Sequence, residues 1–246
     1  MSISLQFIGS GDAFGSGGRL QACMLLRGAG DDVVIDLGAS SLVGLKRAHI
    51  DTASLKWIAI SHLHGDHFGG LPFLVLDGQF SRREETLTIA APAGAEQRVT
   101  ALMEASFPGS STVQRKFDVV YKELHHGEWV ELGPARITCR EVDHASGAPS
   151  LALRIEYGGR VVAYSGDTAW TDSLVEIARH ADLFVCEGYT LTRPISYHMD
   201  VTTLLGHLDE IGCRRMIVTH MGPDMLANRG AVDVEFAEDG LVVEIA

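Results

Sequence analysis

HLHGDH, residues 62–67, places three imidazoles and one carboxylate within six positions of the chain. It follows the short apolar run WIAI at 57–60, whose length and β-branched content predict a buried strand. The six residues are therefore expected on the loop that leaves this strand. FGGLP at 68–72 comes next and leads into an apolar segment, to about Phe80, that is predicted to be helical.

The spacing of these side chains suits metal binding. His62 and His64 alternate, so in an extended segment they project to the same side. Asp66 and His67 follow a glycine and can turn toward a different point, so one peptide can supply two adjacent metal ions. Imidazole nitrogen with carboxylate oxygen suits zinc best, with manganese or iron as alternatives. A polar loop that holds histidines by coincidence is the other reading, and the density of ligands argues against it.

The pattern His62-x-His64-x-Asp66-His67 resembles the signature of the metallo-β-lactamase superfamily. The longer string SHLHGDHFGGLP, residues 61–72, is similar to the tRNase Z-like phosphodiesterase branch in particular. The resemblance implies an α/β fold, the four-layer αββα sandwich of the metallo-β-lactamase type, and a homodimer. Because no long linker or low-complexity segment interrupts the chain, we expect one domain over residues 1–246.

The bulk composition is that of a globular protein. A length of 246 residues fits one sizeable domain, or two fused halves that share a core. No apolar run approaches the roughly 20 residues that span a bilayer, and residues 1–5 read as a first strand rather than an export signal. The four cysteines are scattered without a CxxC pair, which favours reduced, mostly buried thiols and a cytoplasmic location.

The charge of the chain bears on its partners. The formal net charge is −12, and the chain would stay acidic with two divalent ions bound. Nucleic-acid binders usually carry a basic patch, but here Arg82-Arg83 is followed directly by Glu84-Glu85. This pattern argues against a large nucleic-acid partner and for a small-molecule substrate, although folding could still assemble a local patch.

A glycine-rich segment, GSGDAFGSGG at 9–18, follows the strand predicted over residues 3–8. It is not a P-loop, because no Gly-Lys-Ser/Thr follows. A flexible turn and a substrate-facing loop are both compatible with its composition. The tRNase Z-like branch opens with a similar loop near the metal site, which favours the second reading.

Asp36 ends the second of two strands predicted at 23–26 and 33–37. Its carboxylate could orient a ligand histidine from outside the metal site. It could also cap the helix expected near 41–49. The family resemblance favours the orienting role.

The rest of the chain alternates predicted strands and helices. Strands are expected at 87–91, 151–157, 160–164, 183–186, 216–219 and 240–245, and helices at 94–106, 172–180 and 201–211. Residues 117–142 predict successive antiparallel strands with turns at 126–127 and 133–134. His125 and His126 are adjacent on a strand and face opposite ways, so we assign them structural or surface roles.

Three further polar residues stand at the ends of predicted apolar strands, where ligands belong in layered α/β folds: His144, Asp167 and His220. Each alone could be a satisfied polar group, but together they match later motifs of the resembled family in order and context. By that resemblance seven residues hold two metal ions: His62, His64 and His144 hold one, Asp66, His67 and His220 hold the other, and Asp167 bridges both.

Such a centre has a defined chemistry. Two metal ions about 3.5–4 Å apart can share a water and lower its pKa from about 15.7 to about 7. The resulting hydroxide can attack phosphorus or an acyl carbon, and the ions stabilise the negative charge that develops.

Hydrolysis of a phosphodiester also needs a proton for the departing alkoxide. His198 lies just ahead of a predicted helix whose first turn can be capped, and alone it could equally be a surface histidine. The tRNase Z-like branch has a histidine at this point that protonates the leaving group, and Glu187 matches a glutamate that would orient it. The resemblance thus makes Asp66, His198 and Glu187 the catalytic residues.

The chain departs from the tRNase Z pattern in two places. The usual His-Glu-Ala-Thr box reads CEGYT at 186–190. The tRNase Z enzymes also carry a long tRNA-gripping insertion between the third histidine and the bridging aspartate. Here His144 and Asp167 are only 23 positions apart, and a predicted hairpin fills the interval. The metal motifs therefore carry over, and the tRNA-processing activity does not.

These observations predict an enzyme, a cytoplasmic dinuclear metal-dependent hydrolase with two divalent ions, Zn²⁺ first and Mn²⁺ or Fe²⁺ as alternatives. We expect it to cleave a small phosphodiester, such as a cyclic or short nucleotide, through a metal-bridging hydroxide with His198 as proton donor. A carboxyl-ester, lactone or thioester hydrolase on the same metals is the main alternative, because fold does not fix function. A tRNA 3′-end endonuclease and a metal-binding protein without turnover are further alternatives.

Overall fold

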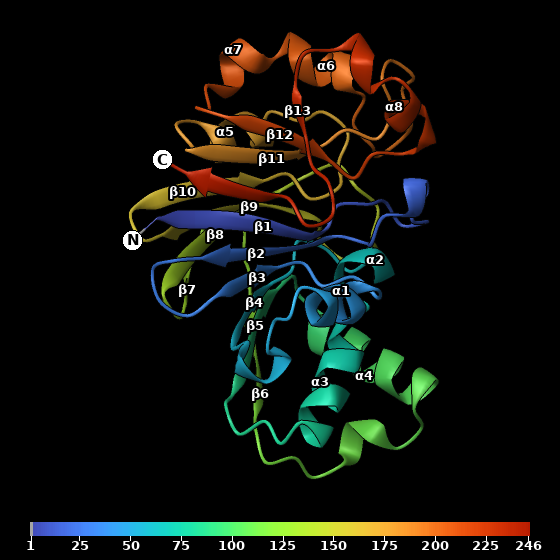
Figure 1. Cartoon of the computed structure of the whole chain (residues 1–246), viewed down its shortest axis with the longest axis vertical. Helices are drawn as coiled ribbons and strands as arrows, with labels where there is room; N and C mark the ends of the chain where they lie inside the picture. Colours follow the sequence, from blue (N-terminus) through green and yellow to red (C-terminus); the bar gives the residue numbers. More distant parts are fainter. Residues whose placement is uncertain (1) are drawn as a thin grey trace.

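Two seven-stranded sheets pack face to face, and helices cover their outer faces (Figure 1). The computed structural model describes residues 2–246, so Met1, at the start of the segment expected to form the first strand, lies outside the described residues. The layering is the αββα sandwich that the family resemblance implies.

The first sheet takes most of its strands from the N-terminal half of the chain. Its spatial order is β14 (Val242–Ile245), β1 (Ile3–Gly9), β2 (Cys23–Arg27), β3 (Val33–Ile35), β4 (Trp57–Ala59), β5 (Leu87–Ala91) and β6 (Val119–Glu123). Strands β3 to β6 are parallel to one another. The helices of this half are α1 (Ser41–Arg47), α2 (Gly65–Phe68), α3 (Leu71–Phe80) and α4 (Ala95–Ser106).

The second sheet is built from the C-terminal half. Its spatial order is β13 (Glu235–Phe236), β12 (Met216–Thr219), β11 (Leu183–Glu187), β10 (Arg160–Tyr164), β9 (Leu151–Tyr157), β8 (Ala135–Glu141) and β7 (Trp129–Leu132). Strands β10 to β13 are parallel. Its helices are α5 (Ser173–Ala178), α6 (Val201–Gly206), α7 (Leu208–Ile211) and α8 (Pro223–Ala227).

Alternation along the strands divides the core into three layers. Ile35 and Val185 point into the layer between the sheets. Their neighbours point outward, Val34 toward the helices of the first half and Phe184 toward those of the second. Because successive strand residues face opposite sides, strands buried on both faces must be apolar throughout, as the runs that predicted them are.

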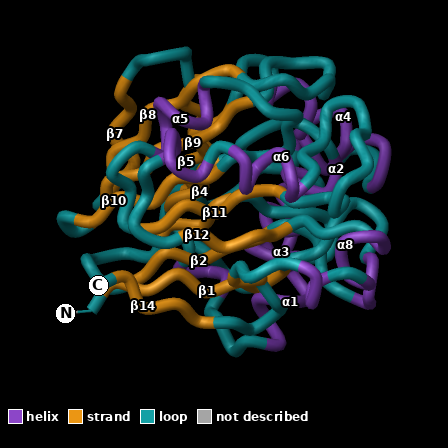
Figure 2. The backbone as a smooth tube through the Cα atoms, turned by 90° about the horizontal axis from the view of Figure 1, so that it is seen from above, coloured by secondary structure: helices purple, strands orange, loops and turns teal. Residues whose placement is uncertain are grey.

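The parallel strands bring distant segments of the chain to one edge. β4, β10, β11 and β12 all end at the same edge of the sandwich, where the loops that follow them meet. Figure 2 shows the strands of both sheets running side by side, with most of the helices gathered toward one end. Polar residues that follow these strands are therefore neighbours in space, although they are far apart in sequence.

One strand pairing differs from the prediction. Residues 119–123 form β6, which pairs in parallel with β5 in the first sheet rather than antiparallel with β7. The chain then crosses to the second sheet, where β7 and β8 form the antiparallel hairpin that the sequence predicts. Alternating hydrophobicity predicts that a segment is a strand, but it does not specify which strand lies beside it.

A second difference concerns residues 201–211, which were predicted as one helix and form two, α6 and α7. The helix breaks after Gly206 at His207, whose φ of −110° is not helical and whose ring stacks 3.8 Å from that of Trp170. The short elements β13, α2 and α8 were not predicted, and Asp66 and His67, which were expected on a loop, lie in α2. The remaining predicted strands and helices agree with the structure to within two residues at each end. No helix within residues 2–246 is both long and apolar enough to span a membrane.

Two hairpin glycines give a test of the packing. Gly133 and Gly159 both have positive φ, at 61° and 78°, but a Cβ on Gly133 would collide with the indole of Trp57, while one on Gly159 would meet nothing within 4 Å. Gly159→Ala should lower the free energy of unfolding by about 1–2 kcal/mol through the backbone alone. Gly133→Ala should cost about 1–3 kcal/mol more because of the clash. Urea unfolding of both variants measures the difference, and equal losses would contradict the packing described.

Candidate metal centre

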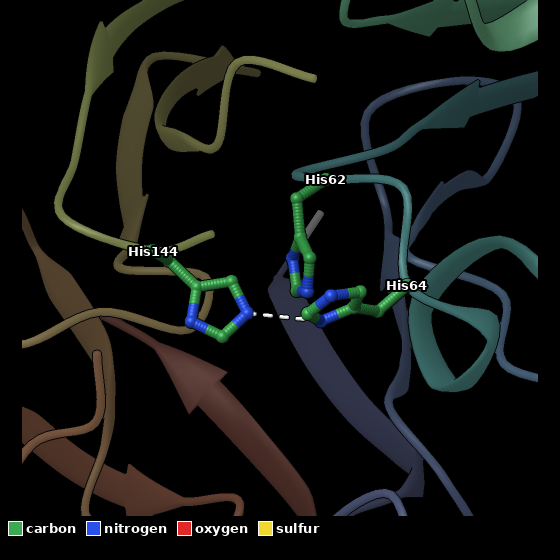
Figure 3. Close-up of side chains that lie close together, drawn as sticks. All are labelled: His62, His64 and His144. Atoms are coloured by element: carbon green, nitrogen blue, oxygen red, sulfur yellow. Dashed lines mark hydrogen bonds between the residues drawn. The ribbon is translucent and has the colours of Figure 1, made fainter. Parts of the chain in front are cut away.

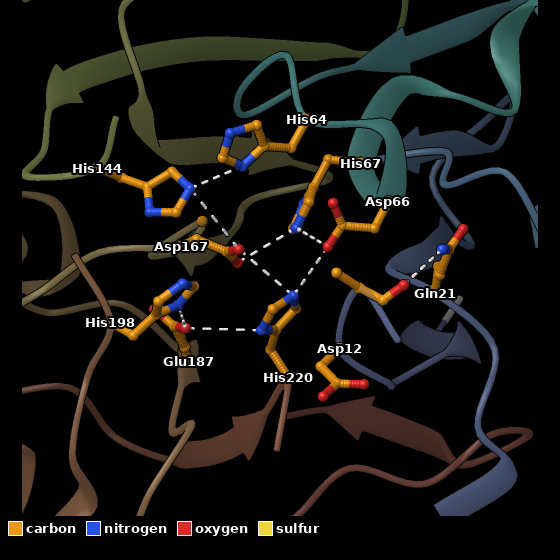
Figure 4. Close-up of polar contacts among 12 residues, drawn as sticks. Asp12, Gln21, His64, Asp66, His67, His144, Asp167, Glu187, His198 and His220 are labelled. Carbon is orange, nitrogen blue, oxygen red and sulfur yellow. Dashed lines mark hydrogen bonds and ion pairs between the residues drawn. The ribbon is translucent and has the colours of Figure 1, made fainter. Parts of the chain in front are cut away.

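All seven residues predicted as metal ligands converge at the edge where the strands end (Figure 4). They come from five segments: His62 and His64 from the loop after β4, Asp66 and His67 from α2, His144 after β8, Asp167 after β10 and His220 after β12. Each sheet therefore contributes part of the cluster.

The first group is His62, His64 and His144 (Figure 3). One nitrogen from each ring lies within 4.8 Å of the others, and His144 Nε2 is 2.9 Å from His64 Nδ1. His144 Nδ1 donates to the carbonyl oxygen of Tyr197 over 2.9 Å. That hydrogen bond places the ring proton on Nδ1 of His144 and leaves Nε2 facing the group.

The second group is Asp66, His67, Asp167 and His220, all of them buried. His67 Nε2 lies 3.3 Å from Asp66 Oδ2 and 3.2 Å from Asp167 Oδ1. His220 Nε2 lies 3.2 Å from Asp66 Oδ2 and 3.4 Å from Asp167 Oδ2. Two carboxylates and two imidazole nitrogens thus face one point.

Asp167 lies between the two groups. Besides its contacts in the second group, its Oδ2 is 3.8 Å from His62 Nε2 and 4.0 Å from His144 Nε2. Within this site it is the carboxylate close to imidazoles of both groups, which is the position that a bridging ligand requires.

Unpaired polar atoms show that these residues fit metal ions. His62 Nε2, His67 Nε2 and Asp167 Oδ1 are buried and make no hydrogen bond within residues 2–246, although the last two atoms lie 3.2 Å apart as an ion pair. A buried polar atom that nothing satisfies costs roughly 1–3 kcal/mol, which applies most fully to His62 Nε2, whose nearest carboxylate oxygen is 3.8 Å away. A donor set of buried imidazoles and carboxylates is that of a binuclear metal site.

The protonation of the cluster supports the same conclusion. Burial by itself would raise the pKa of Asp167, but His220 and His67 outweigh it and hold that pKa well below its ordinary value. Burial opposes a charge on His67 and His220, yet Asp167 raises the pKa of both well above the ordinary value. Burial lowers the pKa of His62, so its ring is neutral. A divalent cation can replace the protons that the carboxylates hold on His67 and His220.

Asp36 orients the second group from behind. Its Oδ2 lies 2.6 Å from His67 Nδ1, and its two oxygens also accept from the backbone and hydroxyl of Ser61 at 2.7 Å each. The orienting role is thus the one the structure supports, and the capping alternative is wrong, because Ser40 stands at the N-cap of α1.

Two residues of the centre have strained backbones. Asp36 and His220 both have φ of 55°, a left-handed conformation that is uncommon outside glycine. Such residues cost of order 1–3 kcal/mol each and persist where the surroundings fix them. Here each turns its chain at the end of a strand and aims its side chain into the centre.

His198 and Glu187 form a pair beside the second group. His198 Nδ1 lies 2.5 Å from Glu187 Oε1, and that oxygen is also 3.5 Å from His220 Nδ1. Glu187 Oε2 accepts from the backbone N–H of Thr168 over 2.7 Å, so the buried carboxylate is fixed at both ends. The helix cap at this point is Asp200, which accepts from the N–H of Thr203.

The outer nitrogen of His198 is available for chemistry. Its side chain is 24% exposed, and Nε2 has no hydrogen-bond partner in the described chain. Burial opposes protonation of His198, but the hydrogen bond to Glu187 and its charge outweigh burial and raise the pKa. The ring can therefore carry a proton on Nε2 beside the metal centre, as general acid catalysis requires.

The glycine-rich loop at 9–18 packs against the strand end that carries His220. The backbone N–H of His220 donates to Ser10 O over 3.2 Å, and Gly11 pairs with Met221. Gln21 Nε2 donates to Ala13 O over 3.0 Å, and Figure 4 shows Gln21 at the margin of the centre. The loop is thus part of the wall of the site.

Sequence reasoning missed Tyr189. Its ring centroid lies 4.9 Å from that of His198 and 6.3 Å from that of His220. The only signal was the departure CEGYT from the usual His-Glu-Ala-Thr box, which marks position 189 as unusual but does not show where its side chain lies.

Comparison with known proteins gives a family and a fold. A family model described as "Anti-Pycsar protein Apyc1" matches residues 3–242. An uncharacterized protein of Mycobacterium tuberculosis, Rv1339, is 32% identical over 233 residues, which cover 91% of this chain and 82% of that protein.

Solved structures show the same architecture. Human short-form tRNase Z superposes with a TM-score of 0.81 at 22% identity and covers 99% of both chains. A diphosphatase from the PhnP family gives 0.79 at 20% identity, covering 99% of this chain and 98% of that one. The metallo-β-lactamase fold protein YhfI from Bacillus subtilis gives 0.78 at 20% identity, covering 98% and 99%. The fold is that of the metallo-β-lactamases.

The contact between Asp36 and His67 can be tested through metal affinity. Asp36→Asn removes the charge that orients His67, and we expect the weaker of two bound ions to lose roughly 10- to 100-fold in affinity. Competition with a chromophoric chelator measures this change. Asp31→Asn, at an exposed aspartate paired with Lys56, is the matched control and should leave the affinity for both ions unchanged. Unaltered affinity for both ions in Asp36→Asn would contradict the orienting role.

Proposed function

This chain belongs to the family described as Anti-Pycsar protein Apyc1, and from that premise and the geometry of the centre we propose that it is a dinuclear metal-dependent hydrolase. The reaction we propose is cleavage of a small phosphodiester, such as a cyclic or short nucleotide, with His198 as the proton donor. The observation that carries this proposal is a free imidazole nitrogen, on His198, beside two groups of side chains that both have imidazole nitrogens within 4.0 Å of Asp167.

In this proposal His62, His64 and His144 hold one ion, Asp66, His67 and His220 hold the other, and Asp167 contacts both. When bound, two such ions supply an activated water at neutral pH and positive charge that stabilises an anionic transition state. Asp36 fixes the ring of His67, and the carbonyl of Tyr197 fixes the ring of His144.

Residues of the chain itself deliver the proton that the leaving group needs. Glu187 accepts from His198 Nδ1 and so holds the imidazolium in one orientation with Nε2 outward. As the P–O bond breaks, Nε2 gives its proton to the oxygen of the leaving alcohol. An alkoxide is a poor leaving group without this proton, whereas a nitrophenolate leaves without help.

The proposal of a small substrate is supported by the chain between His144 and Asp167. The hairpin of β9 and β10 occupies this interval, at the place where the tRNase Z enzymes that the sequence resembles carry a tRNA-gripping arm. The net charge of −12 also disfavours a large polyanion. A reaction at phosphorus is supported by the names of two proteins of the same fold, a diphosphatase and a tRNase Z.

Further proposals concern the setting of the enzyme. We propose Zn²⁺ as the ion, with Mn²⁺ or Fe²⁺ as alternatives, because the ligands are imidazoles and carboxylates. We also propose one domain over residues 1–246, a homodimer, a small-molecule substrate and a cytoplasmic location. The four cysteines support a reducing compartment, because all are free and three are buried.

A substrate panel tests the reaction type. Zinc- and manganese-loaded protein should hydrolyse bis(p-nitrophenyl) phosphate, and Asp167→Ala should abolish this activity because it removes the shared carboxylate. His198→Ala should keep most activity on bis(p-nitrophenyl) phosphate. It should lose about 10²- to 10⁴-fold on adenosine 3′,5′-cyclic phosphate, whose leaving oxygen needs a proton. Hydrolysis confined to p-nitrophenyl acetate or a lactone would refute the phosphodiester assignment.

The pH profile tests the pairing of His198 with Glu187. The pKa of His198 is raised by Glu187, so the proton needed by an alkoxide is present below that pKa and is lost as the pH rises through it. Glu187→Gln should lower this pKa and move the alkaline limb of kcat for the cyclic phosphate to lower pH. The same limb should be weak or missing with bis(p-nitrophenyl) phosphate. An alkaline limb that does not move in Glu187→Gln would contradict the pairing.

A further inference from the structure

Tyr189 is fixed beside the proposed proton donor by its backbone. It stands two residues beyond the end of β11, after Gly188. Its N–H donates to Met199 O over 2.9 Å, and its carbonyl accepts from Gly222 N over 3.0 Å. One side of Tyr189 is thus tied to the segment that carries His198, and the other to the segment that carries His220.

The ring of Tyr189 covers part of the site. It is tilted by 32° to the ring of His198 at 4.9 Å and by 40° to the ring of His220 at 6.3 Å. A Cβ on Gly222 would lie 2.9 Å from Tyr189 Cε2, so only glycine at 222 lets the ring lie against this backbone. The aromatic face is therefore held in place on one wall of the centre.

The hydroxyl of Tyr189 has no partner in the described chain. The side chain is only half-buried, and no hydrogen bond reaches its hydroxyl from anywhere in residues 2–246. Phenol groups that are buried for packing alone usually find a partner. An aromatic ring with an unpartnered hydroxyl, next to an imidazole nitrogen that is also free, is suited to contact a substrate.

We infer that Tyr189 is a specificity-determining residue that binds the nucleoside part of the leaving group, by stacking and by a hydrogen bond from its hydroxyl. This inference rests on the proposed function. The leaving oxygen must come within about 2.6–3.2 Å of His198 Nε2, which brings the group attached to it near the ring of Tyr189, whose centroid is 4.9 Å from that of His198. Flat, polar leaving groups such as nucleosides fit that wall better than flexible alkyl chains do.

The chemistry of the contact is selective for bases and sugars. Stacking of a base on an aromatic side chain accepts any base, because every base has a π face. The phenol adds a donor for a ring nitrogen or a ribose hydroxyl. The position also differs from the tRNase Z pattern, since the His-Glu-Ala-Thr box that the sequence resembles has threonine where Tyr189 stands in CEGYT.

Binding and kinetics test the inference on zinc-loaded protein. Calorimetry compares adenosine 5′-monophosphate with ribose 5-phosphate, which lacks the base. Wild type should prefer the nucleotide, and Tyr189→Leu, which keeps an apolar side chain against Gly222, should lose roughly 5- to 150-fold of that preference. Tyr189→Phe should keep most of it. In hydrolysis of adenosine 3′,5′-cyclic phosphate, Tyr189→Leu should raise KM by a similar factor with a smaller change in kcat.

Controls separate recognition from folding. Phe80→Ala removes an exposed aromatic ring at the end of α3 and should change none of these values. The zinc content and Tm of each Tyr189 variant should match wild type. If wild type cleaves phosphodiesters but Tyr189→Leu keeps both its KM and its preference for the nucleotide, the inference falls and the proposed function stands. If wild type cleaves no phosphodiester, the proposed function falls, and the inference with it.

Discussion

The buried carboxylate of Asp167 is the interaction on which the rest of the structure depends. It lies within 4.0 Å of imidazole nitrogens from both groups, on segments that leave both sheets. A buried charge without compensation is costly, and a buried pair is tolerated only when its geometry is good. The two halves of the sandwich must therefore meet in one relative position, in which all of these rings face Asp167.

Two further carboxylates, one from each sheet, contact the rings from behind and hold them in that position. Asp36 follows β3 of the first sheet and fixes His67, while Glu187 ends β11 of the second sheet and contacts His198 and His220. Both carboxylates are fully buried and fixed by backbone N–H groups, so neither can rotate away. Asp36 and His220 have left-handed backbones, and this strain is the cost of aiming their own side chains into the centre.

The cluster and the loops that surround it have different consequences for the proposed function. In the proposed function the cluster fixes the type of reaction, because it would hold the metal ions that supply positive charge and activate the attacking water. The loops around it, namely residues 9–18 and the segment from 188 to 198, fix what can approach. The same cluster on the same fold can therefore serve different substrates when these loops differ, and Tyr189 stands where such a difference would act.

The sequence by itself determined the motif at 62–67 and most strand and helix positions, because each of these is written in a short local pattern. The other three cluster residues, His144, Asp167 and His220, were indicated by the resemblance to a known family, through the order of its motifs. The sequence could not determine that β6 joins β5 rather than β7, that Asp36 contacts His67 rather than capping α1, or that Tyr189 lies against His198. These outcomes depend on contacts between segments far apart in the chain. Hydrophobic period and motif spacing record which face of an element is buried, but the partner of that face is chosen only when the sheets pack.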